Sequence, residues 1–228
     1  MKLFQILMMA AKKGIEILIN TCSGWTSNYR WNNVECDGND LVLSKGEPDD
    51  ISGLNLWLKA DSLDLNDNDA VGTWADDSGN DNDATQGTAA NKPTFKTNIL
   101  NGKPVVRFDG SNDWLSIGND VFDGISSEVS VFIVASSASA TKNTSCFIAL
   151  PDDTGNRFNC HLPWGGGTLF WDFGNVGSNG RISKAWGGTT DTHYIWTLLA
   201  GSGMAIRRDG SQIYSSANSS TFTPGTKH

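Results

Sequence analysis

The stretch of sequence that decides the fold runs from Gly53 to Gly110 and reads GLNLWLKADSLDLNDNDAVGTWADDSGNDNDATQGTAANKPTFKTNILNGKPVVRFDG. It begins with an apolar strand, Leu54 to Leu58, which ends in an acidic turn. A Trp-Ala-Asp-Asp-Ser-Gly-Asn segment (Trp74 to Asn80) follows, and Asn101-Gly102 then opens a second strand, Pro104 to Asp109. Asn-Gly accepts the positive φ angles of a two-residue hairpin turn, so this order predicts antiparallel strands joined by tight turns.

The same run resembles the laminin-G-like, concanavalin A-like jelly-roll domains that are common in phage and bacterial surface proteins. The matching positions, many of them glycines and turn residues, are GLNLWLKAD, the later W-A-D-D-S-G-N-D-N-D-A-T, Lys92-Pro93, and NGKPVVRFDG followed by D-W-L. The resemblance covers residues 51–228 and implies an all-β, two-layer antiparallel β-sandwich, the concanavalin A-like jelly roll. Residues 1–50 then form a short N-terminal extension or anchoring arm, and residues 51–228 form the sandwich.

The rest of the chain supports an all-β architecture. Short apolar runs predict further strands at Val129–Ala135, Cys146–Leu150, Leu169–Phe173, Tyr194–Leu199, Met204–Arg208 and Ser211–Ser215. Asp209-Gly210 stands between the last two runs, as in a hairpin. No segment between these runs shows a helical period. Antiparallel strands at this spacing favour two packed layers.

Length and charge exclude some classes of function. The 228 residues are enough to bury a core without disulfides or metal ions. A net charge of −8 opposes binding to phosphate backbones, so nucleic acid is not expected as a partner. No apolar run reaches the roughly 18 residues of a membrane span, so none is expected.

The chain opens with an apolar segment, MKLFQILMMAAKKG at residues 1–14. A secretory signal is disfavoured because Gln5 interrupts the run and Lys12-Lys13 stand where a cleavage site belongs. Exposed apolar segments are unfavourable on a free monomer, so we expect this one to anchor the protein on a partner subunit, through Leu3, Phe4, Ile6, Leu7, Met8 and Met9. The alternative is a strand or helix folded back on its own sandwich. Ile15–Ile19 then alternates as a strand, and Asn20–Asp40 is typical of a loop region.

Catalytic motifs are weak in this sequence. Glycoside hydrolysis needs two carboxylates across one groove, and the best match, Glu35-Cys36-Asp37, stands in a region rich in Gly and Asn outside the predicted sandwich. The three histidines, His161, His193 and His228, lie near no G-x-S-x-G elbow. We therefore expect no catalytic residues and no enzymatic activity.

Acidic and amide residues concentrate after the first strand. Calcium binds six to eight oxygen ligands, so a calcium site is one interpretation of Asp76, Asp77, Asn80, Asp81 and Asp83. Asp and Asn also form turns by bonding their own backbone, which is the alternative. Calcium is the one cofactor that the sequence suggests.

Tryptophans suggest a carbohydrate site. Flat aromatic faces with nearby amide and carboxylate groups suit sugars, and glycine-flanked segments favour exposure of Trp164, Trp171, Asp172, Asn175 and Trp186. A core or interface position is the alternative for these tryptophans. Trp57, Trp74, Trp114 and Trp196 fall in strands or at positions of the family core and are expected to be buried.

The four cysteines show no metal-binding spacing. Cys22 and Cys36 are placed to close a loop in the extension, and Cys146 and Cys160 lie on strands that we expect to be neighbours. Free buried thiols are the alternative for both pairs.

The resemblance implies a non-enzymatic virion surface protein: a capsid decoration, head-fibre or tail-fibre component that binds other capsid or tail subunits through its N-terminal segment. Its sandwich would bind host glycan, and the protein would be a homo-oligomer or part of a larger assembly. One alternative is a structural capsid cement without glycan binding. Another is a secreted, extracellular carbohydrate-binding module or glycanase fragment of bacteria.

Overall fold

The computed structural model describes residues 5–10, 34–37, 40–43, 48, 51–141, 145–149 and 155–224. Within these ranges the chain contains sixteen β-strands, no α-helix, and three short 3-10 helices: η2 (Ala60–Ser62), η3 (Ala89–Asn91) and η4 (Asn119–Phe122). All the strand pairs in it are antiparallel. The prediction of an all-β fold with antiparallel sheets is therefore confirmed.

The larger sheet has six strands in the order β16-β15-β14-β9-β1-β4. The bounds are β1, Gln5–Ala10; β4, Leu54–Trp57; β9, Val129–Ala135; β14, Tyr194–Ala200; β15, Met204–Arg208; and β16, Ser211–Ser216. In β9 every second side chain is buried, beginning with Val129, while those between are half-buried. This alternation is the period of a strand with one face in a core.

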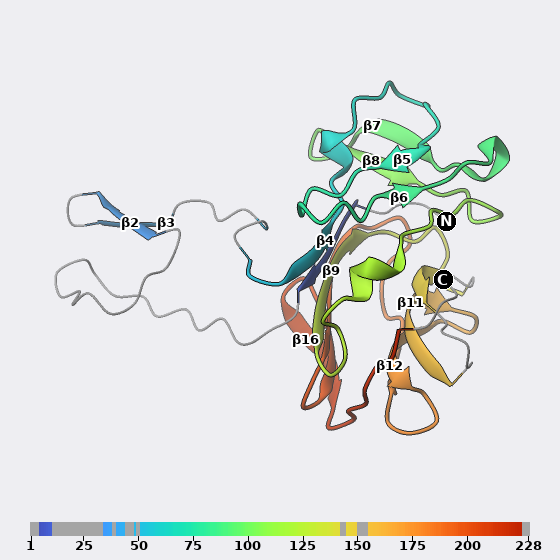
Figure 1. The fold of residues 1–228 in the computed structure, drawn as a ribbon. Helices are drawn as coiled ribbons and strands as arrows, with labels where there is room; N and C mark the ends of the chain where they lie inside the picture. Colours follow the sequence, from blue (N-terminus) through green and yellow to red (C-terminus); the bar gives the residue numbers. More distant parts are fainter. Residues whose placement is uncertain are drawn as a thin grey trace.

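The smaller sheet has four strands in chain order: β10 (Ser145–Ala149), β11 (Asn156–Trp164), β12 (Thr168–Asn175) and β13 (Arg181–Ala185). Figure 1 shows β11 and β12 on one side of the molecule and β9 and β16 on the other. Buried residues of both sheets belong to one hydrophobic cluster. Phe158 and Phe173 of the smaller sheet pack there with Phe122 and with Phe222, which follows β16.

Two short hairpins lie together above the sheets in the view of Figure 1. They are β5 (Thr73–Trp74) with β6 (Ala84–Thr85), and β7 (Thr94–Leu100) with β8 (Lys103–Arg107). Asn101 and Gly102 join β7 to β8 with φ angles of 51° and 78°. Asp209 and Gly210, between β15 and β16, have the same two values. The tight turns predicted at both dipeptides are thus confirmed.

The N-terminal segment forms part of the sheet of its own chain. Strand β1 pairs with β4 on one side, where Met8 faces Trp57, and with β9 on the other, where Met8 faces Phe132. Met8, Met9 and Ala10 therefore have ladder partners on both sides within the chain. Ile6, Leu7, Met8 and Met9 were expected to anchor the protein on a partner subunit. Their position in β1 corresponds to the alternative, a strand folded back on its own chain. Leu3 and Phe4 lie outside the described residues.

The remaining strands form a separate hairpin, β2 (Val34–Asp37) with β3 (Asp40–Leu43). Sequence reasoning assigned residues 34–37 to a loop, and this was wrong: Glu35-Cys36-Asp37 lies within a strand. The predicted strand Ile15–Ile19 lies outside the described residues.

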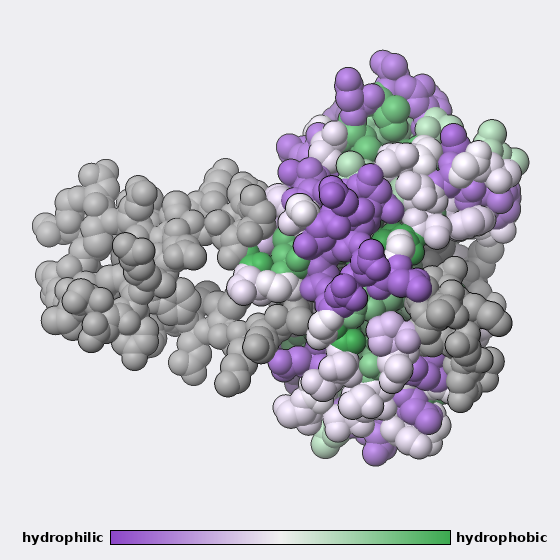
Figure 2. Space-filling model, viewed as in Figure 1, coloured by the Kyte–Doolittle hydropathy of each residue, from purple (hydrophilic) through white to green (hydrophobic). Residues whose placement is uncertain are grey.

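Apolar residues are scattered over the described surface. In the view of Figure 2, hydrophilic residues cover much of the region around β5–β8, and apolar residues appear as small separate areas. The large exposed apolar side chains are Ile51, Ile99, Trp114, Ile148, Trp164, Ile195 and Tyr214. Isolated residues of this kind are ordinary on soluble surfaces, but two are tryptophans, Trp114 at 50% and Trp164 at 39% exposure. None of the helices in the described ranges is long and apolar enough to cross a membrane.

Candidate functional site

The outward face of the smaller sheet carries a row of polar side chains. Because side chains alternate along a strand, burial of Phe158, Cys160 and Leu162 in the core turns Asn159 and His161 of β11 to the opposite face. The register continues this row, with Asn159 opposite Asp172 of β12 and Asp172 opposite Arg181 of β13. Three neighbouring strands therefore present an amide, a carboxylate and a guanidinium side by side.

Arg181 and Asp172 form a two-pronged ion pair. The arginine Nε donates to Asp172 Oδ1 and its Nη2 donates to Oδ2, both at 2.6 Å. The aspartate is fully buried, while the arginine side chain is 34% exposed and lies over the Phe170 ring at 4.7 Å. The carboxylate raises the pKa of the guanidinium. Such paired geometry is needed to offset the desolvation of a buried charge.

Asn159 connects this ion pair to His161. Its Nδ2 lies 3.3 Å from Asp172 Oδ2, to which it donates, and 2.8 Å from His161 Nε2. The Asp172 carboxylate thus orients the Asn159 amide group, and His161 Nε2 accepts the second N–H of that amide. Asn159 is 2% exposed and its Oδ1 has no hydrogen-bond donor in the structure. A buried carbonyl oxygen without a donor is unfavourable by about 1–3 kcal/mol.

His161 is held neutral in this row. Burial lowers the pKa of its imidazole to about 4, although the Asp172 charge opposes the shift. A neutral ring is consistent with an Nε2 that accepts the Asn159 proton. The Trp164 ring lies 4.2 Å from the imidazole, centroid to centroid, at an angle of 55°. The row therefore ends in a half-exposed indole beside a neutral imidazole.

Only part of the predicted carbohydrate site is brought together here. Trp164 and Asp172 belong to the row, but the exposure expected for Trp171 and Trp186 was wrong. Trp171 is fully buried, and Trp186 is 5% exposed and packs against Trp196 at 5.5 Å. Asn175 ends β12, and its Oδ1 accepts from the backbone N–H of Gly177, so it forms a turn.

Sequence reasoning missed Asn159, His161 and Arg181 as members of a site. It expected Cys160 to lie on a strand but gave that strand no bounds, and it predicted no strand for β13. The signal was present in N-R-F-N-C-H-L, where Phe158, Cys160 and Leu162 recur with period two. The sequence also led us to expect a buried Trp114. This was wrong, because its side chain is half exposed.

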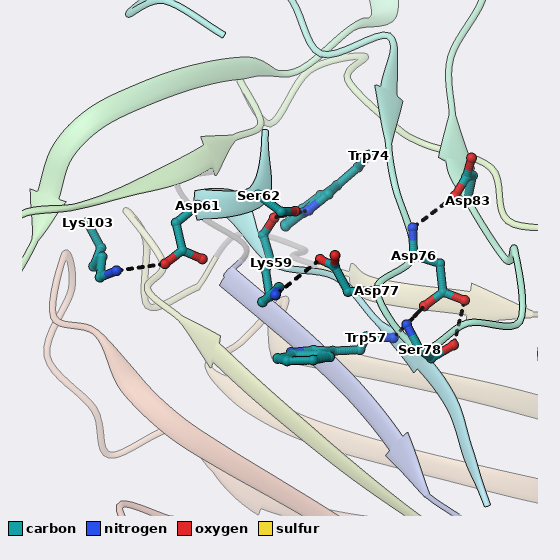
Figure 3. Close-up of polar contacts among 10 residues, drawn as sticks. All are labelled: Trp57, Lys59, Asp61, Ser62, Trp74, Asp76, Asp77, Ser78, Asp83 and Lys103. Carbon is teal, nitrogen blue, oxygen red and sulfur yellow. Dashed lines mark hydrogen bonds and ion pairs between the residues drawn. The ribbon is translucent and has the colours of Figure 1, made fainter. Parts of the chain in front are cut away.

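The suggested calcium residues organise turns. Figure 3 shows the Asp76 carboxylate facing Trp57 and Ser78, with the Asp83 side chain near the Asp76 backbone. Asp76 Oδ1 accepts from the backbone N–H of Trp57 at 2.8 Å, and Oδ2 accepts from Ser78 Oγ at 2.7 Å and from the Asn82 N–H at 3.1 Å. Asp83 Oδ1 accepts from the N–H of Asp76.

The other members of this group also have local roles. Asp77 pairs with Lys59 at 3.8 Å, Asn80 donates to the carbonyl of Leu54, and Asp81 has a positive φ of 58°. Among the described residues no group of three or more His, Cys, Asp or Glu side chains could hold a metal ion. The geometry matches the turn-forming alternative.

Comparisons of this chain with protein-family models, with curated proteins and with solved structures found no match. The resemblance to laminin-G-like domains remains a prediction from the residues of the 53–110 stretch.

Proposed function

We propose that this protein is a non-enzymatic, jelly-roll sandwich that binds carbohydrate through the outward face of β11–β13 and is displayed on a virion surface. The observation that carries the proposal is the unpartnered Asn159 Oδ1 in the same row as the half-exposed Trp164 ring. Sugars present both complementary features, namely hydroxyl donors and apolar ring faces. A sugar ring would stack on Trp164, and a hydroxyl inserted beside the imidazole would donate to Asn159 Oδ1, which is buried in the unbound structure.

The chemistry of the row favours binding over hydrolysis. A glycosidase needs two carboxyl groups, one of them able to give up a proton. In the described part of β10–β13 the row contains one carboxylate, Asp172, and both of its oxygens accept from Arg181. Both oxygens of the one carboxylate are thus engaged, and the second carboxyl group that hydrolysis needs is absent from the described part of this row.

A virion location is proposed from the residues that resemble phage and bacterial surface domains. Display in many copies suits a shallow site, because several weak contacts on one particle combine into useful avidity. The protein would then serve as a capsid decoration, head-fibre or tail-fibre component.

A glycan array with the full chain tests the binding proposal, followed by titration of any sugar that binds. Trp164→Ala should weaken binding by about fivefold to tenfold, the value of one stacking contact. Trp114→Ala removes a similarly exposed tryptophan from a different part of the molecule and should leave the affinity unchanged. Equal losses in both variants, or binding unaffected by Trp164→Ala, would contradict the assigned site.

A structural cement without glycan binding is the second candidate. It is favoured by the burial of Asp172 at 0% and Asn159 at 2%, which is typical of a network that stabilises a sheet. An array without any bound sugar, together with antibody labelling of purified particles, would support this candidate. Recovery of the protein only as a free secreted monomer would contradict both virion roles.

A further inference from the structure

Cys146 and Cys160 lie on neighbouring antiparallel strands. In the β10–β11 ladder Ser145 faces His161 and Phe147 faces Cys160, so Cys146 is the extra residue of a β-bulge. The bulge turns Cys146 toward the core side of the sheet, and like Phe147 it packs against the buried cluster to which Cys160 belongs. The Cys146 thiol lies close enough to raise the pKa of the Cys160 thiol.

The surroundings of the two thiols differ. Cys160 is fully buried, whereas Cys146 is half-buried, and both are free thiols in the structure. In a bulge two residues lie across from one on the partner strand, so Cys146 and Phe147 both lie across from Cys160. Regular facing positions have Cα atoms about 4.5–5.5 Å apart, and a disulfide spans roughly 4.4–6.8 Å. The bulge therefore places the two cysteines across from each other, on the core side of the same pair of strands.

We propose that Cys146 and Cys160 are a cross-linking site that closes to a disulfide when the protein meets a small-molecule disulfide such as oxidised glutathione. Cys146, the accessible thiol, attacks the oxidant as its thiolate and releases one glutathione. Cys160 then loses its proton and attacks the Cys146 sulfur, releasing the second glutathione. The protein gives up two electrons and two protons, and the oxidant becomes two thiols.

The second step should be the slower one. Burial raises the pKa of the Cys160 thiol well above its usual value, and the neighbouring Cys146 and Asp172 add to the shift. Because the thiolate is the nucleophile, cross-linking should accelerate as the pH rises from neutral to alkaline.

The cross-link would hold the edge strand β10 on β11, the strand that carries Asn159 and His161. It would close a loop of 15 residues, from 146 to 160. Closure of such a loop raises the melting temperature by about 5–10 °C in a chain of this size. This inference is independent of the proposed carbohydrate binding.

The test uses the full chain with Cys22→Ser and Cys36→Ser, so that the only thiols are the two in question. After incubation with oxidised glutathione, mass spectrometry should show the loss of two hydrogens, and peptide mapping without reductant should show residues 146 and 160 joined. The melting temperature should rise and return to its starting value after reduction with dithiothreitol.

Cys160→Ser in the same background is the matched control, and it should give only a glutathione adduct on Cys146. A stable adduct or two unreacted thiols in the two-cysteine protein would overturn the proposal. If that protein does not fold, peptide mapping of the oxidised four-cysteine chain decides between the same outcomes.

Discussion

The indole Nε1 of Trp171, on the smaller sheet, donates a hydrogen bond of 2.9 Å to the carbonyl oxygen of Leu199, on the larger sheet. Trp171 is fully buried, and its ring also meets Phe158 edge-on at 5.5 Å. One side chain therefore joins the two sheets by packing and by a directed polar contact.

Trp171→Phe should lower the free energy of unfolding by about 2–4 kcal/mol. The change leaves the Leu199 carbonyl without its donor and creates a small cavity. Urea unfolding followed by circular dichroism measures the loss. Trp164→Phe, at a half-exposed position, should change stability by less than about 1 kcal/mol. Similar losses in the two variants would contradict a bridging role for Trp171.

Arg181→Met should destabilise the protein by about 3–5 kcal/mol, because Asp172 then remains buried without its cation. The double variant Arg181→Met/Asp172→Leu removes both charges and should be less destabilised than Arg181→Met alone. Chemical denaturation of the unmodified protein, the two single variants (Arg181→Met and Asp172→Leu) and the double variant completes a double-mutant cycle. Additive losses would show that the two side chains do not depend on each other.

His161 should make the protein less stable in mild acid. Its pKa is about 4 in the folded state and near 6.5 when solvated. Between these values the unfolded chain binds a proton that the folded chain does not, so stability is full above about pH 6.5 and falls as the pH drops toward 4. We expect the titration of His161 to lower the free energy of unfolding by about 1–3 kcal/mol over this pH range. In His161→Gln the dependence of unfolding free energy on pH should be flatter by that amount.

Gly174→Ala should destabilise the protein more than Gly124→Ala. Both glycines have positive φ angles, 81° and 75°, so both substitutions strain the backbone by about 1 kcal/mol. A Cβ at Gly124 meets nothing within 4 Å, whereas at Gly174 it would overlap the Thr221 carbonyl and lie 2.6 Å from Ser220 Oγ. The difference in melting temperature between the variants measures the steric part, and equal values would contradict this packing.

Sequence patterns predicted the elements that depend on local physics. The strand Val129–Ala135 and the turns at Asn101-Gly102 and Asp209-Gly210 follow from apolar runs and from residues that tolerate positive φ. For β11, Cys160 was expected on a strand but the bounds were not predicted, although residues from Arg157 to His161 alternate between polar and apolar. The proximity of Asn159, Asp172 and Arg181 could not be predicted, because it depends on the register of three neighbouring strands.

Burial of tryptophans was harder to predict than strand position. Trp164 and Trp171 stand seven residues apart in glycine-flanked segments, yet one is half exposed and the other is fully buried. The face on which each ring lies depends on the strand register and on the bulge between His161 and Trp164. Neither is encoded in the composition of the segment, so Trp114 and Trp171 were both assigned to the wrong environment.

The position of β1 has a consequence for biosynthesis. Gln5 and its ladder partner Val134 lie roughly 130 residues apart in the sequence, so Val134 is synthesised well after Gln5. Strand β1 therefore has no partner on one of its two sides until β9 has been synthesised. Contacts between such distant positions slow folding, so chaperones that shield the unpaired edge of β1 during synthesis should raise the yield.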